Sequence, residues 1–196
     1  MSRKVRRVPY HLDPKGIRAL PPEEIRVILR GADDLIMRGG RTLLVMILKG
    51  SRAKEVLSRS LDQSPAYGFY KQTTPADVLA RVDWLIRKGY LAIEYDGRLP
   101  MLIYTPEGWE IERETLSDEH LRNLDLALAG SQQPIDMSHL KDRNREMIWR
   151  LLDKIEASGD PRYIPALEAW APIDYKKVRA RIRSVIQVLK GPVAES

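Results

Sequence analysis

The sequence contains no cysteine, which excludes disulfides, thiolate metal sites and cysteine nucleophiles. Its three histidines, His11, His120 and His139, are scattered and show no metal-ligand spacing. Phosphate-binding loops, dinucleotide-binding fingerprints and G-x-S-x-G serine motifs are also missing. We therefore predict a binding protein and not an enzyme, with no cofactor and no metal.

Long hydrophobic runs are missing too. The longest apolar run, "LLVMIL" at 43–48, is too short to cross a bilayer. The basic N-terminus has no apolar segment behind it, which argues against a secretory signal. These features predict a cytoplasmic protein with no membrane partner.

Basic side chains are abundant and unevenly distributed. The net charge is +6 and the pI about 9.5. Lysine and arginine concentrate in three blocks, at residues 1–18, 35–60 and 171–190. Such blocks favour a polyanionic partner, most often nucleic acid, although solvated surface charge is the alternative.

Hydrophobic periodicity and capping residues predict a mostly helical chain. The clearest helix follows Thr74, an N-cap candidate, with Pro75 in its first turn and Asp77 completing a T-x-x-D capping pattern. Ser117 is expected to cap a later helix. The predicted helices cover 21–36, 41–49 (apolar on every side), 51–61, 74–88, 117–129, 142–157, 161–170 and 175–189.

One β-hairpin interrupts this pattern. The runs Tyr90–Tyr95 and Leu99–Thr105 flank Asp96-Gly97, a strong signal for a type I′ turn with both residues at positive φ. The hairpin tip would carry Tyr95, Arg98 and Leu99. Buried helix, short helix, loop, capped helix and hairpin together form the order of a winged helix-turn-helix.

The residues of this region resemble the RQC domain, the winged helix that follows the motor of RecQ-family helicases. The matching motifs are Lys49-Gly50-Ser51, Tyr67-Gly68, Gly89-Tyr90-Leu91 and Thr105-Pro106-Glu107-Gly108. The chain resembles a small free-standing bacterial relative that carries this domain without the helicase motor or its zinc module. The resemblance therefore implies DNA binding, and it does not imply unwinding.

In the RQC family the wing acts as a wedge, so the resemblance implies a protein that recognises duplex ends, forks or junctions and not a sequence. Tyr95 or Leu99 would meet the terminal base pair, and Arg98 a phosphate. A phosphate site is expected where one helix ends and the next begins. The predicted nucleic-acid-binding residues are Lys49, Ser51, Arg52, Lys54, Tyr95, Arg98, Leu99, Arg41, Lys71 and Lys88. A plain structural hairpin is the alternative.

Two other surfaces have predicted roles. Asp77 and Trp84 suit a major-groove reading face poorly, so the Trp84–Arg81 face is expected to pack against a partner or another part of the chain. Residues 142–189 resemble HEAT-type helical hairpins, and Lys176, Arg179 and Arg183 would form a second basic face on them. Solvated charge is the alternative there.

We expect a basic arm at 1–20, a winged-helix domain with one preceding helix at 21–114, a helix and linker at 115–141, HEAT-like hairpins at 142–190 and a tail at 191–196. Two rival functions stay open. One is a dimeric winged-helix transcription regulator, and the other is an RNA- or protein-binding adaptor. RNA and a helicase or other protein acting in trans are further partners to consider.

Overall fold

The computed structural model describes residues 6–130 and 135–191. Parts of the predicted arm (1–5), linker (131–134) and tail (192–196) lie outside the described residues. The chain divides into two units, Met1–Glu112 and Arg113–Ser196, each with its own apolar core. We call them the first and the second unit and describe each by itself.

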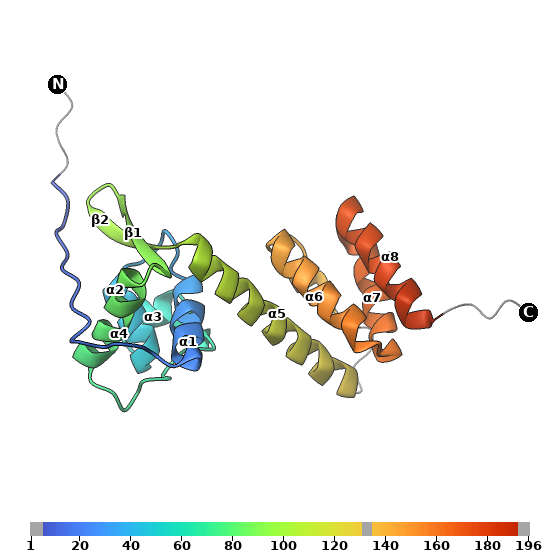
Figure 1. Cartoon of the computed structure of the whole chain (residues 1–196), viewed down its shortest axis with the longest axis horizontal. Coiled ribbons are helices and arrows are strands. Elements are labelled where there is room, and N and C mark those ends of the chain that lie inside the picture. The colour runs from blue at the N-terminus through green and yellow to red at the C-terminus, as the bar shows by residue number, and fades with distance from the viewer. Residues whose placement is uncertain (1–5, 131–134, 192–196) are drawn as a thin grey trace, which may run out of the picture. The chain divides into compact units, whose positions relative to one another are not determined.

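The first unit is a winged helix preceded by one helix. It is mostly helical and carries a two-stranded antiparallel hairpin, as predicted (Figure 1). In chain order its elements are α1 (Pro22–Asp33), α2 (Arg41–Lys49), α3 (Lys54–Ser58), a 3-10 turn η1 (Leu61–Gln63), α4 (Pro75–Arg87), β1 (Leu91–Asp96) and β2 (Leu99–Tyr104). The hairpin is the wing.

Helix α2 lies at the centre of the first core. Leu44, Ile47 and Leu48 are fully buried, and they join Leu85 of α4 and Leu102 of β2 in one apolar cluster. A helix that is apolar on all sides has no stable place at a surface. The prediction of a buried helix at 41–49 is confirmed.

Helix α4 begins as the sequence predicts. The Thr74 side chain accepts a hydrogen bond from the Asp77 amide, and Pro75 occupies the first turn. The Thr74 hydroxyl also donates to the Asp77 carboxylate at 2.7 Å. This capping fixes the start of the helix that would read bases in a helix-turn-helix protein.

The wing has the predicted strands but not the predicted turn. Asp96 pairs with Leu99, so the two loop residues are Gly97 and Arg98, one position later than expected. Gly97 has φ +56°, whereas Arg98 does not have positive φ. Positive φ at the first loop residue alone is the pattern of a type II′ turn, so the type I′ prediction was wrong.

Helix α5 (Pro106–Ala129) starts directly after the wing and contributes to both units. The predicted helix start at Ser117 was therefore wrong. Ser117 is fully buried inside α5, where its hydroxyl donates to the Glu114 carbonyl at 2.8 Å. A serine that bonds back to the preceding turn is compatible with a helix interior, although the same residue type favours caps.

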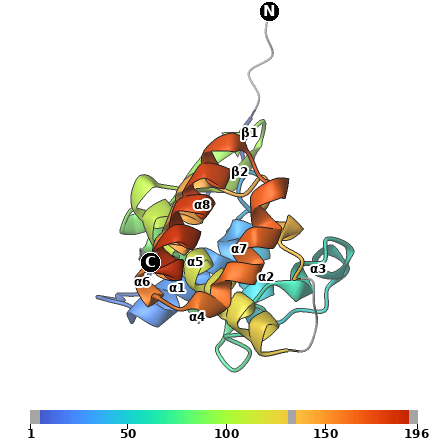
Figure 2. The same cartoon turned by 90° about the vertical axis from the view of Figure 1, so that its right-hand side faces the viewer.

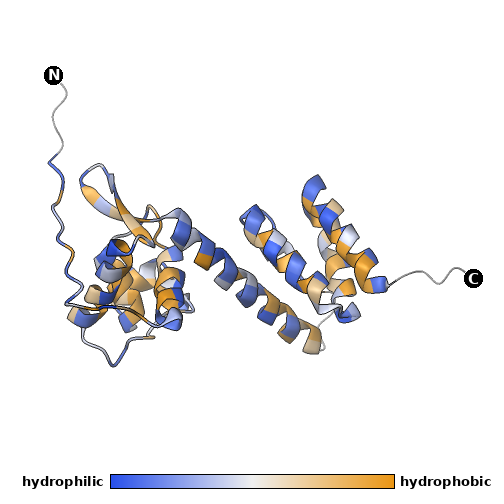
Figure 3. Cartoon of the chain, in the orientation of Figure 1, coloured by the Kyte–Doolittle hydropathy of each residue, from blue (hydrophilic) through white to orange (hydrophobic). Residues whose placement is uncertain are grey.

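The second unit consists of the rest of α5 and a group of shorter elements. These are η2 (Ser138–Leu140), α6 (Arg145–Ser158), η3 (Pro161–Tyr163), α7 (Ile164–Trp170), η4 (Ala171–Ile173) and α8 (Lys176–Lys190). Helix α8 packs against both α6 and α7 (Figures 1 and 2). Apolar residues alternate with hydrophilic ones along α6 and α8 (Figure 3). The resemblance to HEAT-type hairpins stays a prediction.

The second core is centred on a buried indole. Trp170 is fully buried, and its Nε1 donates to the Asp174 carboxylate at 2.8 Å. Asp174 in turn accepts the Tyr175 amide at 2.7 Å. A buried carboxylate needs such donors to offset its desolvation, so this aspartate ties α7 to the start of α8.

Among the residues that the structure describes, no helix is long and apolar enough to cross a membrane. In the same part of the chain, no three histidine, aspartate or glutamate side chains come together as a metal-binding group.

Candidate nucleic-acid interface

The first two sequence motifs lie against each other and form one corner. The Gly68 amide donates to the Ile47 carbonyl at 2.9 Å, and the Tyr67 hydroxyl donates to the Ser51 carbonyl at 3.1 Å. A Cβ added to Gly50 would lie 3.1 Å from the Gly68 Cα, so the two backbones meet where no side chain fits easily. Lys49-Gly50-Ser51 and Tyr67-Gly68 therefore define the local shape between α2 and α3.

The cations at this corner fall into two groups. The Lys49 ammonium donates to the carbonyls of Tyr70 (3.1 Å), Lys71 (2.7 Å) and Thr73, so it holds the loop before α4. Arg52, Lys54 and Lys71 are exposed, and among the described residues their side chains have no carboxylate partner. Arg52, Lys54 and Lys71 are therefore the cations of this corner that a ligand can reach.

Ser51 has a local role at the same corner. Its hydroxyl oxygen accepts the Ala53 amide at 3.2 Å, just before α3 begins at Lys54. The Ser51 side chain is partly exposed. Ser51, Arg52 and Lys54 thus lie together at this corner, whereas the Lys49 ammonium is engaged by the loop before α4.

The other two motifs meet at the base of the wing. The Thr105 hydroxyl lies 2.5 Å from the Gly89 carbonyl oxygen and 3.1 Å from that of Tyr90, and it accepts the Gly108 amide at 3.1 Å. A Cβ on Gly108 would come within 1.9 Å of the Tyr90 carbonyl oxygen. Thr105 therefore caps α5 and closes the hairpin at once, and Gly108 permits the contact.

At the wing tip, one apolar side chain is left exposed. Leu99 is 54% exposed, so about half of this apolar side chain faces solvent. Tyr95, in contrast, is half-buried, and its hydroxyl donates to the Val8 carbonyl at 2.7 Å. Leu99 is thus an exposed apolar side chain at the wing tip, whereas Tyr95 binds another segment of the chain through its hydroxyl.

That segment belongs to the N-terminal arm, by which we mean residues 6–17 from here on. The first residues of the arm lie beside the wing (Figure 1). The Val8 amide donates to the Arg98 carbonyl at 2.9 Å, and the Arg98 Nε donates to the Arg6 carbonyl at 3.2 Å. The rings of Tyr10 and Tyr95 lie 6.2 Å apart. The arm is therefore attached to the turn of the wing by its backbone.

Further along, the arm crosses α4. The Asp13 amide donates to the Asp83 carboxylate at 2.8 Å, and the Lys15 ammonium bonds the Asp77 carboxylate at 2.9 Å. Hydrogen bonds from Lys15 and Thr74 hold the pKa of Asp77 below its ordinary value. Both acidic side chains that α4 directs away from the core are thus engaged by the arm.

Arg41 is part of the same contact. Its guanidinium donates to Asp83 at 2.5 Å and to the His11 carbonyl at 2.9 Å. The Asp83 side chain is only 2% exposed, so Arg41 balances a buried charge. Arg41 is among the residues predicted to bind nucleic acid. In the structure its guanidinium is instead paired with Asp83 and bonded to the His11 carbonyl, both in the first unit.

Trp84 and Arg81 are engaged within the first unit, and their use as a contact face for a partner stays a prediction. Trp84 is 6% exposed, its ring stacks on Tyr90 at 6.2 Å, and the Lys88 ammonium lies 5.8 Å above it. Arg81 pairs with Glu24 at 2.9 Å. Lys88 is exposed beside this face.

Arg81 and Glu24 also surround a tyrosine. The Tyr70 hydroxyl donates to Glu24 at 2.5 Å, and Arg81 lies 5.4 Å from its ring centroid. Burial, followed by the hydrogen bond to Glu24, raises the pKa of Tyr70 far above its ordinary value. This phenol therefore stays protonated and serves packing.

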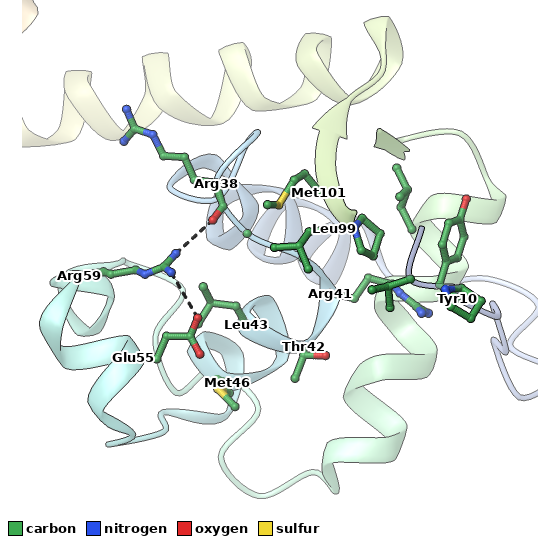
Figure 4. A pocket seen from close by; sticks show the side chains of 16 residues that line it. Tyr10, Arg38, Arg41, Thr42, Leu43, Met46, Glu55, Arg59, Leu99 and Met101 are labelled. Carbon is green, nitrogen blue, oxygen red and sulfur yellow. Dashed lines mark hydrogen bonds and ion pairs between the residues drawn. The ribbon is translucent and has the colours of Figure 1, made fainter. Parts of the chain in front are cut away.

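A pocket of about 410 Å³ opens beside the wing tip (Figure 4). Its walls include Tyr10 from the arm, Leu99 and Met101 from β2, and Leu43 and Met46 from α2. Cations border it as well. Arg59 donates to the Arg38 carbonyl at 3.1 Å and pairs with Glu55 at 3.4 Å, while the Arg38 side chain is exposed. The space next to Leu99 is thus both apolar and basic.

The predicted second basic face on α8 is only partly available. Arg179 donates to the carbonyls of Ala171 (3.0 Å) and Asp174 (3.0 Å), so it holds the turn before α8. Lys176 and Arg183 are exposed. The two remaining cations lie seven residues apart, on one side of the helix.

A buried helix, a corner, a capped helix and a wing define the first unit as a winged-helix domain. The family model for the RQC domain matches residues 22–119, half of the chain, and the chain belongs to this family. RQC domains are non-catalytic winged helices that bind nucleic acid, so the chain carries a DNA-binding domain. No curated protein matches the chain significantly, and neither does any solved structure.

Proposed function

We propose that this chain is a non-enzymatic protein that recognises DNA by shape, preferring duplex ends, forks or junctions. The wing tip would meet the last base pair through Leu99. Arg52, Lys54 and Lys71 would bind backbone phosphates beside it, without base readout. Arg98 is a further phosphate contact at the tip.

The observation that carries this proposal is the contrast between the wing and α4. Leu99 is exposed at the tip, whereas Asp77 and Asp83 of α4 are held by the arm. A sequence-reading regulator needs the outer face of this helix in the major groove. The contacts of the arm with α4 therefore argue against a sequence-reading regulator. They favour the wing as the element that contacts DNA.

The pocket beside Leu99 supports the same proposal. If the last base pair opens against Leu99, one displaced nucleotide needs an environment that suits both its flat apolar base and its anionic phosphate. Tyr10, Met101 and Leu43 supply an apolar wall, and the exposed Arg38 side chain supplies charge. Stacking a base on an aromatic ring such as Tyr10 is worth about 1–3 kcal/mol.

The test is a binding panel of single strand, blunt duplex, fork and four-way junction, in DNA and in RNA, at two salt concentrations. Leu99→Ala should weaken fork binding about fivefold, because half of a leucine side chain is worth about 1 kcal/mol when buried. Binding of blunt duplex should change less.

The matched control is Leu126→Ala, which removes another exposed leucine, 72% exposed on α5. It should leave all affinities unchanged. An equal loss on fork and blunt duplex in Leu99→Ala would refute the wedge role. Tighter binding of the RNA panel than of the DNA panel would instead favour the RNA-binding alternative.

A further inference from the structure

The proposed wedge does not involve the N-terminal arm, and the attachment of this arm to the wing needs its own explanation. Residues 6–10 are exposed, yet residues 6, 8 and 10 contact the wing turn or its strand through backbone or ring contacts. An unattached basic tail would have no reason to follow a hairpin edge. The arm therefore adds a third segment to the two-stranded wing.

Arg7 shows what this segment presents. Its guanidinium carbon lies 4.7 Å from the centroid of the Tyr95 ring. A guanidinium stacked on a ring keeps its N–H groups at its edge, where they fit a phosphate bidentately. Arg6 is exposed beside it, with no carboxylate partner in the described residues.

We propose that residues 6–10 form a phosphate-binding edge of the wing, in which Arg6 and Arg7 contact the DNA backbone next to the terminus that Leu99 meets. This inference rests on the proposed function, because it assigns a further contact to the same DNA. Arg98 connects the two parts, since it carries the tip turn and binds the arm at both its carbonyl and its Nε.

An inhibitory arm is the competing interpretation, and the charges argue against it. The surface that the arm covers on α4 carries Asp77, which repels phosphate and which Lys15 of the arm neutralises. Asp83 beneath it is buried and balanced by Arg41, and the arm gives it only the Asp13 amide. Displacing the arm would leave Asp77 without its cation, so the attached arm adds positive charge at the wing and offsets one negative charge of α4.

The first experiment is the double substitution R6A/R7A, with affinity for a DNA fork measured across a salt series. Each lost phosphate contact lowers the salt slope by about 0.9, so the slope should fall by about 1.8. The control R18A/R26A removes the same charge from two other exposed arginines of the first unit, and should leave the slope unchanged. An unchanged slope in R6A/R7A, or tighter binding, overturns the proposal.

The second experiment detaches the arm without changing its charge. Val8→Pro removes the amide that donates to the Arg98 carbonyl, while Val8→Ala keeps it. Val8→Pro should lower the salt slope and Val8→Ala should not. Equal slopes would mean that the attachment of the arm does not matter for binding, which also overturns the proposal.

The outcomes separate this inference from the proposed function. R6A/R7A should keep the ratio of fork to blunt-duplex affinity, because Leu99 is intact, whereas Leu99→Ala should lower that ratio and keep the salt slope. If only the slope responds, the phosphate edge stands and the wedge fails. If only the ratio responds, the wedge stands and the phosphate edge fails.

Discussion

The two units use their positive charge in different ways. In the second unit, Arg181 pairs with Asp153 and Glu156, and Lys154 of α6 pairs with Glu114 and Asp118 of α5. In the first unit, Arg52, Lys54 and Lys71 are exposed without such partners among the described residues. The contrast is one of position, because Arg41 and Arg81 of the first unit are also paired and Lys176 and Arg183 of the second are exposed. Net charge alone does not distinguish these uses.

The largest expected effect comes from separating the two cores. Trp170→Ala should cost the second unit about 3–5 kcal/mol, because it opens a cavity and leaves buried Asp174 without its indole donor. Thermal unfolding followed by hydrogen exchange should show early opening of the second unit only, at residues 113–130 and 135–191. DNA binding should survive at temperatures where the first unit stays folded.

The matched change in the first core is Leu48→Ala, in a fully buried position of α2. It should cost about 2–5 kcal/mol and weaken DNA binding as the winged helix opens. If Trp170→Ala abolished DNA binding while the first unit remained protected, the division of labour between the units would be wrong.

A smaller effect tests the exposed cations directly. The triple variant R52A/K54A/K71A should lower the salt slope of DNA binding by about 2.7, at about 0.9 per phosphate contact. Its counterpart in the second unit is K176A/K177A/R183A, which removes three exposed cations of α8. A similar slope change in that variant would show that α8 also contacts the backbone, as the second basic face predicts.

The smallest effect concerns the paired charges of the second unit. A hydrogen bond from Lys154, followed by one from Arg150, holds the pKa of Glu114 below its ordinary value. A depressed folded-state pKa stabilises the fold above the unfolded-state value, and this contribution is lost as pH falls through the folded value. Unfolding midpoints of the second unit should therefore fall in acid less steeply in Glu114→Gln than in wild type.

The local parts of the fold could be predicted from sequence because their signals lie within a few residues. The start of α4 is predicted by the capping pattern of Thr74, Pro75 and Asp77. The wing is predicted by the two β-forming runs on either side of Gly97. The turn was placed one residue too early because Asp96-Gly97 matches the commoner type I′ pattern. Only the pairing of Asp96 with Leu99 decides which two residues form the loop.

The start of α5 was missed although its signal was visible. Thr105-Pro106 followed by Gly108 has the form of an N-cap with proline in the first turn. The predicted helix start was Ser117 instead. Gly108 is required there because of its contact with the Tyr90 carbonyl, which is a tertiary constraint.

The candidate site could be predicted only where exposure decides a residue's role. Arg52, Lys54, Lys71 and Leu99 are exposed, as contact with a ligand requires, and their role in binding stays a prediction. Lys49, Arg41 and Tyr95 look equally suitable by residue type, but each has a partner far along the chain. The Tyr95 hydroxyl and its acceptor at Val8 are 87 residues apart, and no local pattern encodes such a contact.

The attachments of the hairpin also bear on solubility. A projecting ribbon has strand edges with unpaired amides and carbonyls, which favour uncontrolled association between molecules. Here the Leu102 amide and carbonyl bond Gly39 and Met37, and the Val8 amide binds the carbonyl of the turn. The protein can thus extend a ribbon into solvent while occupying several of the groups that would otherwise recruit a second copy into a growing sheet.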